Sequence, residues 1–177
     1  NLGCETISGT VLMPGQSFSF NEVVGKRSFE NGYKEAMGIV GGDRLSPTPG
    51  GGICQVSGTL YNAVVAADLD ITDWYPHSLK SSYLYYGKDA TVDWDSMKDL
   101  AFKNNTDLPL YIAMWTEPTE GSSIKYDVVC EIYGKPPLPD DEYYRLFVED
   151  LSYISPKEEV KYSVWNELKP GETYNVS

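Results

Sequence analysis

The sequence predicts an α+β fold, in which a mostly antiparallel sheet packs around one central helix. Two observations lead to this prediction. Apolar residues recur at three- and four-residue steps over residues 54–67, which is the period of an amphipathic helix. The other apolar segments are short, rich in β-branched and aromatic residues, and bounded by turn residues, as is typical of strands. The 177 residues suffice for one domain with its own core and a small appendage.

The expected elements can be taken in chain order. Residues 9–25, "GTVLMPGQSFSFNEVVG", predict a strand, a Pro-Gly turn and a second extended piece. A short helix is expected within "ENGYKEAMG" (30–38), and the five Gly and two Pro of residues 41–52 predict a loop. Further strands are expected at "SLKSSYLYYG" (78–87), "ATVDW" (90–94), "PLYIAMW" (109–115) and "SIKYDVVCEIYG" (123–134), with a turn at "NNTDLP" (104–109).

A proline-rich stretch, "GKPPLPDD" at residues 134–141, is the candidate domain boundary. It divides the chain into a main domain over residues 1–137 and a C-terminal β extension over residues 138–177. We expect the extension to pack on the core of the main domain.

Composition narrows the possible partners. The net charge of −12 excludes nucleic acid, because phosphate binding needs clustered Lys and Arg. It also disfavours an anionic membrane surface, and there is no run of about 18 apolar residues that would span a bilayer. The chain begins without Met, and both ends look like cuts in a longer protein. We therefore expect membrane association only through a segment outside this sequence. We also expect the chain to be a monomer.

Three cysteines and one histidine are the residues with the most reactive side chains. Cys4, Cys54 and Cys130 have no spacing that fits a zinc motif, so we expect neither a metal nor another cofactor. An odd number of cysteines leaves at least one thiol free. His77 is the only histidine, so any Cys–His pair must use it.

Cys54 follows three glycines in "GGGICQVSGTLYNA" and begins the predicted helix. On a helical wheel it lies away from the apolar stripe, on the side of Gly58, Tyr61 and Val65. The first turn of a helix stabilises an anion, so we expect the pKa of the Cys54 thiol to be lowered toward the nucleophilic thiolate. The preceding glycines can turn backbone N–H groups toward a developing oxyanion.

His77 lies after the helix, where a following strand can return beside the helix start. A Cys at a helix N-terminus facing a His on a neighbouring strand is the arrangement of papain-like thiol enzymes. Such sites add a group that orients the imidazole. Asp89 is the first candidate, Asp93 is its rival, and a backbone carbonyl is a third possibility. Each residue also has an ordinary alternative: a buried Cys, a loop His after Pro76, and a turn Asp after Gly87.

Several motifs, taken together, resemble the VanW domain family. They are "VLMPGQSFSFNEVVG", "NGYKEA", "GGGICQVSGTLYNAVVAADL", "PHS", "YYGKDATVDW" and "DLAFKNNT", in this order from residue 1 to about residue 135. VanW domains occur in exported proteins of Gram-positive bacteria, which implies a location in the cell wall or at the outer face of the cytoplasmic membrane. The family is associated with vancomycin-resistance gene clusters and with L,D-transpeptidase activity on peptidoglycan. The resemblance implies that Cys54 is the nucleophile and that His77 is the base.

These observations predict a cysteine L,D-transpeptidase that forms 3–3 cross-links between peptidoglycan stem peptides through a Cys thioester. Backbone groups near Gly51, Gly52 and Gln55 would hold the oxyanion, and Arg44 could pair with a stem-peptide carboxylate. Other residues expected at the substrate site are Ser57, Tyr61, Tyr83 and Tyr85. Two alternatives remain: a cell-wall cysteine peptidase or carboxypeptidase, in which water attacks the thioester, and a non-enzymatic wall-binding module.

Overall fold

The computed structural model describes residues 2–40, 44–79, 83–85, 87–121 and 125–134. Its helices are α1 (Leu2–Ile7), α2 (Phe20–Val24) and α3 (Ile53–Ala66). Its strands are β1 (Thr10–Leu12), β2 (Ser17–Ser19), β3 (Glu35–Val40), β4 (Arg44–Pro49), β5 (Asp70–Asp73), β6 (Ala101–Lys103), β7 (Leu110–Pro118) and β8 (Tyr126–Tyr133).

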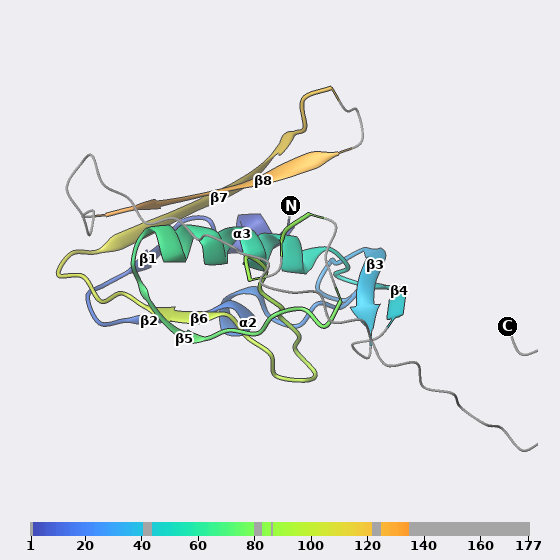
Figure 1. Ribbon diagram of the computed structural model, residues 1–177, viewed down its shortest axis with the longest axis horizontal. Coiled ribbons are helices and arrows are strands. Elements are labelled where there is room, and N and C mark those ends of the chain that lie inside the picture. Colours follow the sequence, from blue (N-terminus) through green and yellow to red (C-terminus); the bar gives the residue numbers. More distant parts are fainter. Residues whose placement is uncertain (1, 41–43, 80–82, 86, 122–124, 135–177) are drawn as a thin grey trace, which may run out of the picture.

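The elements form three layers, with α3 lying between two small sheets (Figure 1). One sheet has the strand order β1-β7-β8 and the other has the order β2-β6-β5. A separate two-stranded sheet, β3–β4, lies at the N-terminal end of α3. All the pairings between these strands are antiparallel. The α+β class and the mostly antiparallel sheets are therefore confirmed.

The core lies where α3 meets the two sheets. The helix buries Val56, Leu60 and Val64, which recur every four residues on one face. From the sheet of β2 and β6, the rings of Phe18 and Phe102 stack with centroids 4.8 Å apart and join the same cluster. Each such fully buried side chain contributes about 1.5–3 kcal/mol relative to an exposed one. This packing fixes α3 and therefore fixes the position of its first turn.

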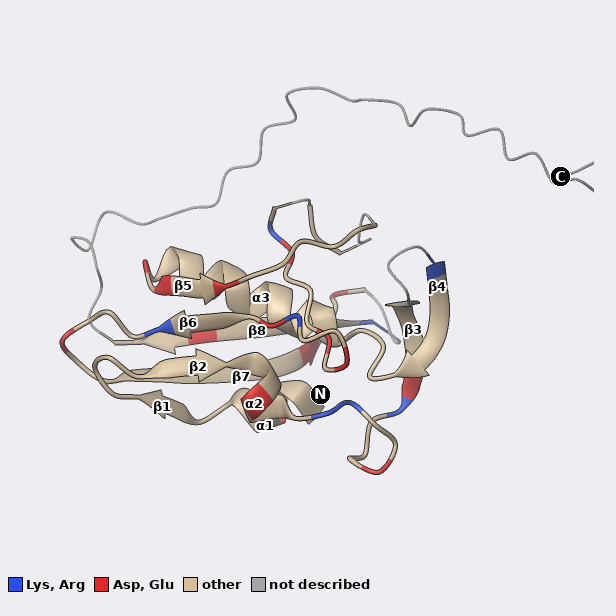
Figure 2. Ribbon diagram, turned by 90° about the horizontal axis from the view of Figure 1, so that it is seen from below, with Lys and Arg blue, Asp and Glu red and all other residues tan. Residues whose placement is uncertain are grey.

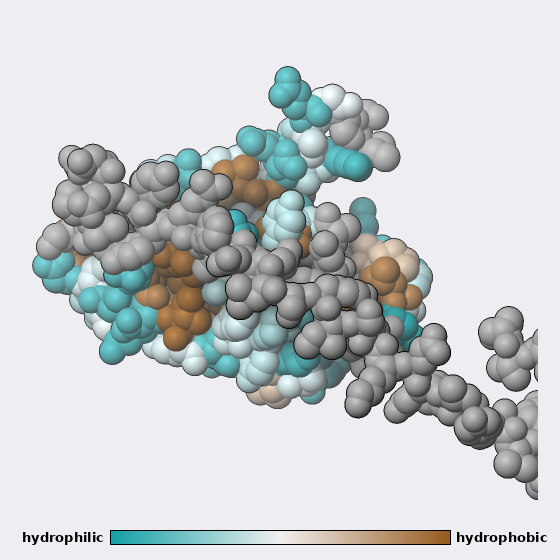
Figure 3. Space-filling model, viewed as in Figure 1, coloured by the Kyte–Doolittle hydropathy of each residue, from teal (hydrophilic) through white to brown (hydrophobic). Residues whose placement is uncertain are grey.

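Charged and apolar side chains are distributed over the surface in small, separate areas. Lys and Arg appear at separate places in Figure 2, including β4, β6 and the segment after α2. On the face in Figure 3, apolar side chains form small patches divided by polar ones. Among the described residues, these views show no basic stripe of the kind that nucleic acid requires.

Two of the local predictions are wrong around the β3–β4 hairpin. Residues 30–38 do not hold a short helix, because Glu35–Val40 is strand β3. Residues 41–52 are not all loop, because Arg44–Pro49 is strand β4. Proline lacks the N–H that a strand inside a sheet must donate on both sides. The β3–β4 hairpin is a separate two-stranded sheet, so each of its strands has one unpaired edge, and β4 can contain proline.

The strands expected at 78–87 and 90–94 are also absent from the described residues. Asp93 and Lys98 form only an isolated bridge there. The strands expected at 109–115 and 123–134 correspond to β7 and β8, and the helix expected at 54–67 corresponds to α3. The C-terminal extension, residues 138–177, lies outside the described residues, so the domain boundary stays a prediction.

Candidate functional site

The three glycines before α3 form a tight turn pressed against β3. Gly50 and Gly52 have positive φ values of 74° and 88°, which side chains other than glycine adopt at a cost. Gly51 makes the closest approach: a Cβ placed on it would lie 2.1 Å from the Ala36 carbonyl oxygen. Gly52 is the N-cap of α3 and provides no side-chain cap for the first turn. The glycines therefore let the chain pass over β3 and turn directly into the helix.

Backbone amides of this turn are partly used by the turn itself. Gly50 N–H donates to the Lys34 carbonyl at 3.1 Å, and Gly51 N–H donates to Thr48 at 3.1 Å. The amides of Ile53 and Gln55 also donate within the turn, to the carbonyls of Gly50 and Gly52, each at 3.0 Å. Among the described residues, the amides of Gly52 and Cys54 have no recorded hydrogen bond. They are the two N–H groups of this turn that a ligand could use.

Cys54 is the second residue of α3 and is half-buried. Its Sγ lies 3.7 Å from the Val92 carbonyl oxygen, to which the thiol donates a hydrogen bond. Burial raises the pKa of the Cys54 thiol, and this outweighs the opposing effects of the Val92 contact and of the Arg27 charge. The expectation of a lowered pKa is therefore wrong for this state, because removal from water counts for more than the helix terminus.

The face of α3 that carries Cys54 is covered by Leu84 and by the segment of residues 87–93. Ser57 is fully buried, and its hydroxyl donates to the Ala90 carbonyl at 2.7 Å. Gly58 leaves room for the covering segment, since a Cβ on it would lie 2.5 Å from a Leu84 methyl carbon and 3.7 Å from the Asp89 Cα. Small residues on this face thus let the segment lie directly on the helix.

The covering segment carries Asp89, which forms a buried pair with His77. The His77 Nδ1 and the Asp89 Oδ2 are 2.6 Å apart, and the two side chains are 5% and 2% exposed. The same carboxylate accepts the backbone N–H of His77 at 2.7 Å and that of Gly87 at 3.1 Å. The Trp74 indole N–H donates to the Asp89 carbonyl at 2.7 Å. This network fixes the imidazole and favours the tautomer with its proton on Nδ1, so that Nε2 carries the free lone pair.

The structure brings Asp89 and Cys54 to the same side of α3. Asp89 packs against Gly58, which lies about one helical turn after Cys54. The Asp89 charge also acts to raise the pKa of the Cys54 thiol, after the larger effect of burial. Within the described part of the chain, no hydrogen bond joins the Cys54 thiol to the His77 ring. Asp93, the rival partner, is exposed, and its carboxylate accepts the backbone N–H groups of Asp95 and Ser96.

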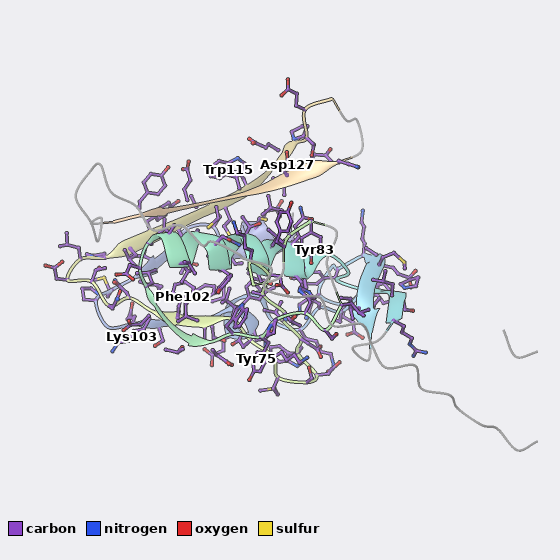
Figure 4. The ribbon with its side chains drawn as sticks, viewed as in Figure 1. Tyr75, Tyr83, Phe102, Lys103, Trp115 and Asp127 are labelled. Atoms are coloured by element: carbon purple, nitrogen blue, oxygen red, sulfur yellow. The ribbon has the colours of Figure 1, made fainter. Side chains whose placement is uncertain are left out.

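The tyrosines expected at the site differ in their surroundings. Tyr83 lies beside the N-terminal half of α3 (Figure 4). Burial raises the pKa of Tyr83, and the nearby Cys54 and Asp89 raise it further, which places Tyr83 close to both. Tyr61 is buried and stacks on Trp74 with ring centroids 5.4 Å apart, so it supports the segment before His77. Tyr85 is largely exposed.

Arg44 lies far from Cys54, contrary to its expected position in a loop beside it. It is exposed and pairs with Val40, at the end of the β3–β4 hairpin that is opposite to Glu35 and Pro49. Arg44 is five steps along β4 from Pro49, which corresponds to roughly 16 Å at about 3.3 Å per residue. The cation that the structure does place near Cys54 is Arg27, which no motif indicated. Its charge acts on the thiol, and its side chain packs against Gly50.

A pocket of about 500 Å³ opens on the other side of the glycine turn. Its walls include Gly51, Gly52 and Gln55, together with Tyr33 and residues from the ends of β7 and β8. Cys54 does not line it. Gly51, Gly52 and Gln55 therefore line a space that the Cys54 thiol does not line.

Among the residues that the structure describes, there is neither a metal-binding cluster nor a membrane-spanning helix. No group of three or more His, Cys, Asp or Glu side chains in those residues could hold a metal ion. None of the helices in the same residues has the length and apolar character needed to span a lipid bilayer.

These features define an α+β protein with a cysteine at a helix start and a buried His–Asp pair, whose aspartate lies on the segment that covers the same helix. Residues 1–128 match the family described as "VanW like protein", and the chain belongs to this family. The resemblance inferred from the motifs is thereby confirmed.

Two curated relatives each match part of the chain. The chain is 46% identical over 112 residues to "Uncharacterized protein YoaR" of Bacillus subtilis (strain 168), covering 63% of this chain and 36% of that protein. It is 31% identical over 111 residues to "Vancomycin B-type resistance protein VanW" of Enterococcus faecalis (strain ATCC 700802 / V583), covering 60% of this chain and 40% of that protein. The matched regions are thus less than half of each relative's length. No solved structure matches the chain.

Proposed function

We propose that this chain is a cysteine acyltransferase that acts on peptidoglycan stem peptides as an L,D-transpeptidase. The observation that carries the proposal is the buried His77–Asp89 pair, 2.6 Å apart, whose aspartate lies on the segment that covers the Cys54 face of α3. A buried imidazole fixed by a carboxylate, near a thiol at a helix start, is the set of groups that acyl transfer needs.

The reaction has two steps. His77 takes the proton of the Cys54 thiol, and the thiolate attacks the carbonyl carbon of the third stem-peptide residue. The peptide bond to the terminal D-alanine breaks, its nitrogen takes the proton from the imidazolium, and a thioester forms. The side-chain amine of a second stem peptide then attacks the thioester. A 3–3 cross-link results, and the thiol recovers a proton through His77.

Two features of the turn support the oxyanion role proposed for it. Among the described residues, the amides of Gly52 and Cys54 have no recorded hydrogen bond, and both lie at the start of α3. A carbonyl attacked by Cys54 comes close to the Cys54 amide, which can donate to the oxygen as negative charge develops. The amides of Ile53 and Gln55 are already donated and are not part of this proposal.

The resting thiol must lose its contact with Val92 before it reacts. Burial keeps the Cys54 thiol neutral, so the base must remove its proton when substrate is in place. The papain-like arrangement of thiol and imidazole belongs to this proposal. It requires the Cys54 Sγ to turn from Val92 toward the His77 Nε2, the ring nitrogen that Asp89 leaves free.

Family membership supports a role at the cell wall. One relative is named a vancomycin B-type resistance protein, and the motifs resemble a family that is associated with peptidoglycan. We propose that the chain works outside the cytoplasmic membrane of a Gram-positive bacterium, with stem peptides as its partners. The chain covers 40% of that relative, so other parts of a longer protein would set its anchoring.

One observation favours a second candidate, a wall-binding module without catalysis. The raised pKa and the half-buried position of Cys54 are also those of a structural thiol. The two candidates differ in whether Cys54 ever carries an acyl group.

The test is mass spectrometry of the protein incubated with purified disaccharide tetrapeptides. We expect an acyl adduct on the peptide that contains Cys54, release of D-alanine and formation of 3–3 linked dimers. Cys54→Ala should abolish all three, whereas Cys130→Ala, which removes a thiol from β8, should retain them. If D-alanine is released without dimers, the enzyme is a carboxypeptidase. If no adduct and no release occur with the folded wild-type protein, the wall-binding module replaces the proposal.

A further inference from the structure

Arg27 is a half-buried cation that lies against the glycine turn. It follows α2, and its guanidinium Nη1 donates to the Asn21 side-chain oxygen at 2.7 Å and to the Gly25 carbonyl at 2.9 Å. A Cβ placed on Gly50 would lie 2.6 Å from the Arg27 Cβ and 2.8 Å from its Cγ. The aliphatic part of Arg27 therefore packs on the turn that opens α3.

Arg27 has no carboxylate in contact with it among the described residues. Its neighbour Lys26, which is exposed, pairs with Asp95 at 3.1 Å. Asp93 and Asp99 act on Arg27 only through their charges, and burial lowers the pKa of Arg27 in spite of them. A guanidinium has five N–H groups, and both recorded bonds use one nitrogen. Partial burial of a cation among neutral partners costs free energy unless an anion pairs with it.

The position of the unpaired cation points to the anion that it would bind. Arg27 packs against Gly50, four residues before Cys54, whereas Asp89 packs against Gly58, four residues after it. The positive charge of Arg27 also acts to lower the pKa of the Cys54 thiol, although burial outweighs this effect. A group bound by Arg27 would sit next to the bond that Cys54 attacks.

We propose that Arg27 binds the free α-carboxylate of the residue that leaves during acyl transfer. The ligand class is a peptide whose C-terminal residue is joined by the bond that Cys54 breaks. This inference rests on the proposed function and deepens it, because it makes the enzyme specific for the last peptide bond of a chain. A planar guanidinium group can bind a carboxylate through two parallel hydrogen bonds. Arg27 takes the role that the sequence had suggested for Arg44.

The test compares two reagents that alkylate thiols and differ in charge. Iodoacetate carries a carboxylate one carbon from the atom that the thiolate attacks, and iodoacetamide is its neutral equivalent. Each loses iodide to the thiolate, so the ratio of their rates does not depend on how much thiolate is present. We expect Cys54 to have a higher iodoacetate-to-iodoacetamide ratio than free glutathione. Arg27→Gln should lower the ratio at Cys54 by about fivefold or more, since one nearby charge is removed.

Lys26→Gln is the matched control, because it removes the same charge from the adjacent, exposed residue. We expect it to change the ratio less than about twofold, since exposed charges are screened. Arg27→Lys keeps the charge without the planar fork, and we expect an intermediate ratio. This variant also serves if Arg27→Gln fails to fold. A wild-type ratio equal to that of glutathione, or equal losses in the Arg27→Gln and Lys26→Gln variants, would overturn the proposal.

A second measurement separates this inference from the proposed function. With tetrapeptide substrates, Arg27→Gln should raise the KM for the free acid. For the wild-type enzyme, KM should likewise be higher for a tetrapeptide with an amidated C-terminus than for the free acid. The amidated peptide should respond little to the Arg27→Gln change. If the alkylation ratio falls as expected but no acyl transfer occurs, the carboxylate site stands and the transpeptidase proposal fails. If transfer occurs and acid and amide react equally, the carboxylate site fails and the transpeptidase proposal stands.

Discussion

Asp89 offers the sharpest test of how the site is built, because one buried carboxylate holds several groups at once. It accepts the His77 side chain at 2.6 Å, the His77 backbone N–H at 2.7 Å and the Gly87 backbone N–H at 3.1 Å. Only 2% of its side chain is exposed, so water cannot replace these bonds. Substitution of Asp89 should therefore affect both the stability of the fold and the orientation of the imidazole.

The expected magnitudes follow from these contacts. Asp89→Ala leaves up to three N–H donors without an acceptor, and each buried unpaired donor costs about 1–3 kcal/mol. We expect a loss of about 3–5 kcal/mol in the free energy of unfolding. Asp89→Asn keeps one oxygen for His77 but turns an NH₂ group toward the Gly87 N–H. We expect it to lose about 1–3 kcal/mol. Because the neutral amide holds the Nδ1 proton of His77 less firmly and does not stabilise the imidazolium that forms, acyl transfer should slow by about 10²–10⁴-fold.

Urea unfolding and the rate of D-alanine release from tetrapeptides measure the two effects. Asn104→Ala is the control, since Asn104 is fully buried and donates to the Leu12 and Leu108 carbonyls, each at 2.9 Å, in a turn after β6. It should lose comparable stability while retaining the acyl-transfer rate at a temperature where both variants are folded. If Asp89→Asn transferred acyl groups at the wild-type rate, Asp89 would not orient the base. If Asn104→Ala were equally inactive, instability alone would explain the loss.

Three further predictions concern the glycine turn and the thiols. Gly51→Ala should destabilise the protein by about 1–3 kcal/mol in thermal or urea unfolding, because its Cβ would lie 2.1 Å from the Ala36 carbonyl oxygen; an unchanged melting temperature would contradict this close approach. At pH 8 iodoacetamide should label Cys54 before Cys130, since Cys130 has a pKa of about 12 and a thiolate fraction on the order of 10⁻⁴, as peptide mass spectrometry can determine; faster labelling of Cys130 would refute the ranking. Burial raises the pKa of both thiols, so the folded state holds these protons more tightly than the unfolded chain does. Stability should be intact below about pH 8.5 and should fall as the pH rises above it, with a smaller fall in Cys130→Ala; urea midpoints at pH 7 and 9.5 that coincide would oppose this.

The parts of the fold that the sequence could predict are those where a single period repeats. The helix at 53–66 has apolar residues at regular steps, and the strands at 110–118 and 126–133 have long β-rich runs between turn residues. The β3–β4 hairpin lacked this signal. β4 contains Pro47 and Pro49, and its composition is that of a loop. It forms a strand because β3 pairs with it from Glu35 to Val40, a long-range partner that composition cannot reveal.

Arg27 was missed for a similar reason. It sits in "GKRS", a short basic stretch that reads as an exposed turn, and nothing near it in the sequence marks it as half-buried. Its environment comes from Gly50, which is 23 positions away, and from α3. Arg44 lay nearer to Cys54 in the sequence, but the hairpin carries it to the far end of β4. Proximity along the chain was a poor guide because a strand moves the backbone by about 3.3 Å per residue.

The position of Asp89 on α3 depends on a different kind of signal, the size of the residues on one helix face. Ser57 and Gly58 lie one turn after Cys54, and their small side chains allow Leu84 and Ala90 to lie directly on the helix. A Cβ on Gly58 would already lie 2.5 Å from a Leu84 methyl carbon and 3.7 Å from the Asp89 Cα, so a larger side chain there would push both residues outward. Gly51 has a parallel role before Cys54, because it lets the chain cross β3 and turn into the helix. Close packing permitted by small residues, rather than local flexibility, is therefore what holds Asp89 against the helix face that carries Cys54.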